Sequence, residues 1–123
     1  MNMFWLKQNQ KRPPKEMRVL DLCFIGEQDG PPERVLKERL IDFFKRDQSV
    51  QQAYLAKVNF GHNNPISVAL CLRTQFGTDK GMVEKVGTIF ASVFGAKEHL
   101  DIVFLDDNQE ASLVKVCQPF FVN

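Results

Sequence analysis

Hydrophobic and polar positions alternate along the chain with two different periods, and each period predicts one kind of element. Four runs rich in β-branched and aromatic residues predict strands, over 17–25, 50–60, 66–74 and 100–105. Two longer segments, in which apolar residues recur every three or four positions, predict amphipathic helices over 31–47 and 78–95. A capping-box spacing from Asp107 to Glu110 predicts a third, short helix over 106–117.

Turn and capping residues stand at the ends of these elements. Pro31 suits the first turn of the first helix, because the backbone N–H that proline lacks is not needed there. Thr78 or Asp79 suits the N-cap of the second helix, and Gly95 suits its C-terminal end. The two middle strands are joined by the short loop "GHNNP", which predicts an antiparallel hairpin.

The order of elements indicates the α+β class with a split β-α-β (ferredoxin-like) arrangement. We expect an antiparallel four-stranded sheet with two helices on one face, a short C-terminal helix and a Pro-Phe-Phe tail. Residues 1–16 form an expected N-terminal leader, in which an apolar stretch precedes an extended spacer with two prolines. Residues 17–123 form a single domain.

The predicted strands carry apolar residues on both faces, although an antiparallel sheet with one wet face should show a polar row there. Ala69 and Cys71, for example, lie opposite the main apolar row of their strand. Several segments are candidates to cover this second face: the third helix with the terminal phenylalanines, the leader, a second subunit or another partner. Phe120 and Phe121 are most simply a buried plug, and a tail that docks a partner is the alternative.

Four segments together point to a known family: "VQQAYLAKVNF", "ISVALCLRT", "LDIVFLD" and "QPFFV". In their order and spacing they resemble the C-terminal domain of SseB, the enhanced serine sensitivity protein, over residues 17–122. The resemblance implies that domain's fold and a bacterial, cytoplasmic setting. The family protein has a whole N-terminal domain where this chain has a leader of 16 residues.

Charge and composition disfavour several kinds of partner. The 16 Lys and Arg residues nearly balance the 15 Asp and Glu residues, so no electrostatic argument favours nucleic acid or a membrane surface. RNA-recognition domains share the expected strand order, but the candidate surface lacks their stacking aromatics. No apolar run reaches the length of a membrane span. The three cysteines, an odd number without a CxxC pair, fit reduced thiols.

The candidate chemistry is sparse. His62 stands in the hairpin loop without an adjacent acid or nucleophile, so a turn histidine is the simpler interpretation. Asp106, Asp107 and Glu110 offer ligands for Mg²⁺ or Ca²⁺, but helix capping explains Asp107 and Glu110 without a metal. We therefore expect no catalytic residue, no cofactor and no metal.

Two functions follow from these observations. The first is a non-enzymatic protein-binding module, with an immunity or accessory protein as one form of it and a homo-oligomer as another. Its expected partner-binding residues are Phe4, Trp5, Leu6, Phe120 and Phe121. The alternative is a small ligand-binding domain or enzyme, with a pocket near Tyr54, Cys71 and His62.

Overall fold

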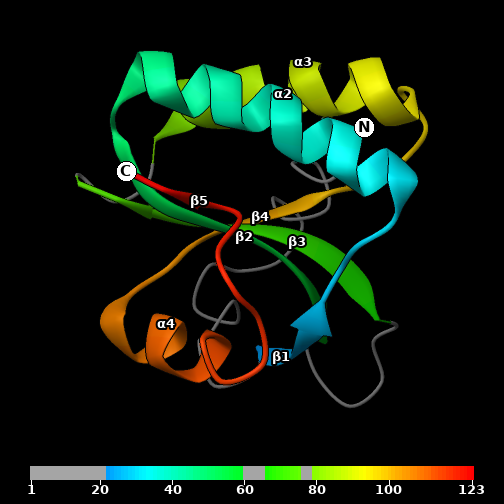
Figure 1. The fold of residues 1–123 in the computed structure, drawn as a ribbon. Helices are drawn as coiled ribbons and strands as arrows, with labels where there is room; N and C mark the ends of the chain where they lie inside the picture. Colours follow the sequence, from blue (N-terminus) through cyan, green and yellow to red (C-terminus); the bar gives the residue numbers. More distant parts are fainter. Residues whose placement is uncertain (1–21, 60–65, 76–78) are drawn as a thin grey trace.

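The computed structural model describes residues 22–59, 66–75 and 79–123, and in these ranges the predicted order of elements is confirmed (Figure 1). The helices and strands are β1 (Cys23–Glu27), α2 (Pro31–Asp47), β2 (Val50–Asn59), β3 (Ser67–Thr74), α3 (Lys80–Phe94), β4 (Asp101–Phe104), α4 (Asp107–Leu113) and β5 (Phe121–Val122). Helices α2 and α3 lie side by side on one face of the sheet, and α4 lies on the other (Figure 1). The α+β class with two helices on one face is therefore confirmed.

The strand arrangement differs from the expected ferredoxin-like, fully antiparallel one. The strands follow the order β1-β2-β3-β4, and β4 runs parallel to β3. In the ferredoxin-like arrangement the first strand separates the third from the fourth. Here β1 pairs with the outer edge of β2 instead, so β3 and β4 become neighbours. Because α3 carries the chain back across the sheet between them, these two strands must be parallel.

The outer edge of β2 is shared by two short strands from the two ends of the domain. Strand β1 pairs with the half of β2 from Ala56 to Asn59, and β5 pairs with Gln52 and Ala53. Beyond β5, the backbone N–H of Asn123 donates to the carbonyl oxygen of Gln51 at 2.9 Å. The C-terminal segment thus adds a fifth strand, which the sequence pattern did not predict.

A bulge in β2 changes which face one of its residues occupies. Strict alternation along β2 would place Val50 on the same face as Tyr54. The pairing of β2 with β3 shifts register between Val50 and Gln52. Val50 therefore joins Ala53 and Leu55 in the hydrophobic cluster beneath α2 and α3, which we call the helix-face core.

The terminal phenylalanines close the helix-face core. The ring of Phe121 lies 5.5 Å from that of Phe44 on α2, and the ring of Phe120 lies 6.5 Å from it. The backbone N–H of Phe120 donates to the carbonyl oxygen of Ala53 at 2.9 Å. Phe121 is buried in this cluster, as a plug would be, and it lies on the face opposite α4.

The second face of the sheet has its own hydrophobic cluster, covered by α4 and the segment after it. We call this the α4-face core. Its buried members are Tyr54, Ala56, Val58, Ala69, Cys71, Leu105, Leu113 and Cys117. Leu22 and Phe24 of the first strand region pack against it. Of the four candidate covers, the third helix is the one that the described residues show in place.

We expect Phe121→Ala to lower the free energy of unfolding by about 3 kcal/mol, because it leaves a cavity against Phe44. Val122→Ala is the matched control, because the neighbouring side chain is 62% exposed and its loss should cost less than about 0.5 kcal/mol. Urea denaturation followed by circular dichroism measures both. Equal effects of the two substitutions would contradict the role of Phe121 in the core.

Candidate functional site

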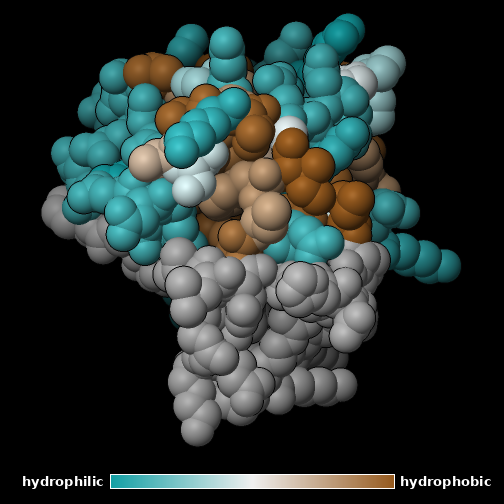
Figure 2. Space-filling model, turned by 90° about the horizontal axis from the view of Figure 1, so that it is seen from below, coloured by the Kyte–Doolittle hydropathy of each residue, from teal (hydrophilic) through white to brown (hydrophobic). Residues whose placement is uncertain are grey.

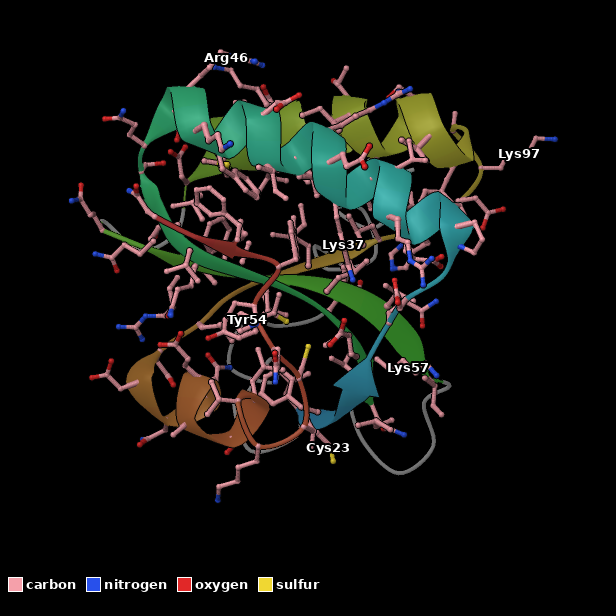
Figure 3. The ribbon with its side chains drawn as sticks, in the orientation of Figure 1. Cys23, Lys37, Arg46, Tyr54, Lys57 and Lys97 are labelled. Carbon is pink, nitrogen blue, oxygen red and sulfur yellow. The ribbon has the colours of Figure 1, made fainter. Side chains whose placement is uncertain are left out.

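A polar cluster lies between the sheet and α4, and we call it the α4 anchor. The hydroxyl of Tyr54 on β2 donates to Oε2 of Glu110 at 2.7 Å. Arg73 on β3 places Nε 3.5 Å from Oε1 of Glu110 and Nη2 2.8 Å from Oδ1 of Asp107. Figure 3 shows Tyr54 pointing from β2 toward α4. The anchor therefore joins two central strands to the short helix.

The anchor depends on where α4 begins. Asp106 is the N-cap: its side chain accepts from the backbone N–H of Gln109 at 2.7 Å, and the Gln109 side chain accepts from the backbone N–H of Asp106 at 2.9 Å. The predicted capping box from Asp107 to Glu110 is thus wrong by one residue. This shift leaves Glu110 available to Tyr54 and Arg73.

The acidic segment considered as a cation site is engaged in these other contacts. Asp106 caps α4, while Asp107 and Glu110 pair with Arg73. Across 22–59, 66–75 and 79–123, no group of three or more His, Cys, Asp or Glu side chains is placed to hold a metal ion.

Burial keeps the hydroxyl and thiol groups of the α4-face core protonated. Desolvation, together with the hydrogen bond to Glu110, raises the pKa of Tyr54 well above its usual 10. Burial likewise raises the pKa of the Cys71 thiol, and raises that of Cys117 to about 11. The Cys117 thiol donates to the carbonyl oxygen of Leu55 at 3.6 Å. Since the thiolate is the reactive form, both thiols are poor nucleophiles at neutral pH.

A second polar pair lies at the start of β4. Nε2 of His99 lies 2.7 Å from Oδ1 of Asp101, whose side chain is buried. His99 is half-buried and supplies a polar contact to Asp101. This pair lies at the start of the edge strand β4, whereas the sheet residues of the α4 anchor lie on β2 and β3, so the two polar groups are separate.

Lys37 ties α2 to the two ends of the domain. Its Nζ lies 3.4 Å from Oε2 of Glu27, 3.6 Å from Oδ1 of Asp29, and 5.9 Å from the centre of the Phe120 ring. Figure 3 shows Lys37 pointing from α2 toward the sheet. These contacts hold Phe120 at the rim of the helix-face core.

The sequence-predicted site residues do not form one site. Phe4, Trp5, Leu6 and His62 lie outside the described residues. Tyr54 and Cys71 are fully buried in the α4-face core, so a ligand would reach them only if a segment that covers this face of the sheet moved. Phe120 and Phe121 lie on the opposite face of the sheet, against α2.

An exposed hydrophobic surface was not predicted from the sequence. Ile25 of β1 is 42% exposed, and Val114 and Val116, directly after α4, are 51% and 42% exposed. The segment after α4 runs beside β1 (Figure 1). Figure 2 shows hydrophobic residues gathered in the middle of the face seen from below. We call the three residues Ile25, Val114 and Val116 the β1–α4 surface. The sequence signal for this surface was the alternation of Val114 and Val116 with Lys115 and Cys117, directly after the end of α4.

The fold and these contacts define a small α+β domain with a mixed sheet covered on both faces and a C-terminal strand added beside the central hairpin. The chain matches the family model of the SseB protein C-terminal domain over residues 16–123, and it belongs to that family. No curated protein and no solved structure matches the chain. None of the helices in the described ranges is long and apolar enough to cross a bilayer.

The raised thiol pKa predicts a loss of stability at alkaline pH. The pKa of Cys117 rises from 9.0 to about 11 on folding, so its stabilising contribution is complete below pH 9 and is lost as pH rises toward 11. We expect the free energy of unfolding to be on the order of 1–2 kcal/mol lower at pH 10.5 than at pH 7.5 because of this group alone. Cys117→Ala should reduce that difference, and Cys23→Ala should leave it unchanged, because Cys23 is exposed. Urea denaturation at the two pH values measures both.

Proposed function

We propose that this chain is a non-enzymatic protein-binding module, and that it binds its partner on the β1–α4 surface. The observation that supports this is the exposure of Ile25, Val114 and Val116 on two neighbouring segments. Exposed aliphatic side chains on segments that run side by side favour a protein contact. Val35, by contrast, is exposed on α2, on the other side of the sheet.

The charges around this surface are mixed, which favours a contact driven by hydrophobic burial. Lys115 stands between the two valines, and Glu27, which pairs with Lys37, lies two positions after Ile25 on β1; both Lys115 and Glu27 are exposed. Such a mixed rim around an apolar centre is the arrangement of ordinary protein interfaces. The partner we infer therefore presents an apolar centre of its own rather than a strongly charged face.

The chemistry of the buried groups supports a role without catalysis. The thiols of Cys71 and Cys117 are protonated at neutral pH, and the Tyr54 hydroxyl is already committed to Glu110. A pocket near Tyr54 and His62 remains the alternative function. It would require α4 to leave the sheet, because the Tyr54 side chain is fully buried.

The leader is the second element that we assign to partner binding. Phe4, Trp5 and Leu6 supply the large aromatic and aliphatic side chains that dominate interface energies. A bacterial, cytoplasmic setting is part of this proposal, and it comes from the family resemblance. In that setting an immunity protein that covers a toxin's active site is one form of the function, and an accessory subunit is another.

The test compares substitutions at two sites of similar exposure. We expect Val116→Asp to abolish capture of a stoichiometric protein partner from the host lysate, because a buried unpaired charge opposes the contact. Val35→Asp is the matched control, since Val35 is 40% exposed and Val116 is 42% exposed. Affinity capture followed by mass spectrometry identifies the partner, and analytical ultracentrifugation measures self-association.

Four outcomes separate the alternatives. A partner lost with Val116→Asp and kept with Val35→Asp supports the β1–α4 surface. A partner kept with Val116→Asp but lost on deletion of residues 1–14 would assign binding to the leader instead. A chain that emerges alone and monomeric would contradict the binding module, whereas dimers abolished by Val116→Asp would identify the partner as a second copy.

A further inference from the structure

Helix α4 is too short to be stable without the sheet. It has seven residues, and isolated helices of this length do not persist in water. Within α4 itself, Leu113 is the buried side chain. The helix therefore exists because of its contacts with the sheet, and its departure from the sheet would be coupled to its unfolding.

Among the residues that the structure describes, several of the contacts that hold α4 in place are polar. Leu113 and Cys117 supply the apolar contacts from the helix and the segment after it. The α4 anchor supplies polar contacts, and part of it faces water: the Asp107 side chain is 92% exposed. Ion pairs at exposed positions contribute little to stability. The hydrogen bond from Tyr54 to Glu110 is the anchor's best-buried contact.

The helix-face core does not depend on α4. Its members come from α2, α3, the sheet, Leu100 and Phe121. Strand β5 is held from that side by Phe44 and by backbone hydrogen bonds to β2. Gln118 and Pro119 lie between Cys117 and Phe120 and connect the two parts. Residues 106–117 can therefore leave the sheet while α2, α3 and β5 stay in place.

We propose that residues 106–117 form a lid that opens as one unit by local unfolding, with the Tyr54–Glu110 hydrogen bond as its main polar fastening. The opened state exposes the second face of the sheet, including Ala56, Ala69 and Cys71. This inference goes beyond the proposed function: the lid carries Val114 and Val116 of the β1–α4 surface, but its opening is an equilibrium of the chain by itself and is measured without a partner.

The two buried thiols report the opening directly. Cys71 lies beneath the lid on β3, and Cys117 lies at the end of the lid. In a Cys23→Ser background, Ellman's reagent should modify both thiols at the same rate. That rate should depend only weakly on low urea concentrations, because the opened state exposes much less surface than global unfolding does.

Two substitutions distinguish local from global opening. Tyr54→Phe removes the hydroxyl that donates to Glu110, and it should accelerate labelling of both thiols roughly 5- to 10-fold. Val86→Ala is the matched control, because Val86 is buried in the helix-face core away from the lid. It should leave the labelling rate unchanged if the lid opens locally. If labelling requires global unfolding, the same substitution should accelerate it about 10-fold or more.

Hydrogen exchange of the unsubstituted chain tests the lid without any variant. We expect the amides of residues 106–117 to exchange together, and well ahead of those of β2 and β3. Exchange of the lid at the same rate as the central strands would overturn the proposal. Labelling of Cys117 without Cys71 would also overturn it, because that pattern indicates fraying of the segment after α4 rather than opening of a unit.

Discussion

Strand β2 is enclosed on both faces and along both edges, and the rest of the fold is arranged to enclose it. Strand β3 covers one edge, while β1 and β5 meet end to end along the other. Helices α2 and α3 cover one face and α4 covers the second. Since a strand this apolar loses stability when either face meets water, the two-layer state without α4 is a minor state of higher free energy. The third layer, α4, therefore stabilises the second face of the sheet in the closed domain.

Periodicity predicted the elements because their signals are local. Leu36, Leu40 and Phe44 recur at helical spacing on α2, and all three are buried in the helix-face core. The strand order could not be predicted in this way, because pairing depends on contacts between distant segments. Strand β5 gave no signal at all: two residues are too few to show a period, and their pairing with Gln52 and Ala53 depends on where Phe121 is buried.

The candidate site was predicted only in part, and the reason lies in two adjacent aspartates. Asp106 with Gln109 and Asp107 with Glu110 have the same capping spacing, so local sequence cannot choose between them. The choice is made by tertiary contacts, because only the first register leaves Glu110 free to accept from Tyr54. Tyr54 and Glu110 were both singled out from the sequence, Glu110 as a helix cap or a cation ligand, but their contact with each other and with Arg73 was not predicted. The β1–α4 surface was missed because exposure depends on which neighbours arrive, which a strand pattern does not reveal.

The contact between Phe44 and Phe121 has a consequence for how the domain is made. Phe121 emerges from the ribosome well after Phe44, because β2, β3, α3, β4 and α4 lie between them in the sequence. The outer edge of β2 and the apolar side of α2 therefore remain exposed to solvent while the intervening sequence is translated. Long-range closure of this kind slows folding and prolongs the exposure of aggregation-prone surface. Chaperones that bind nascent chains would meet this domain with its central strand still uncovered.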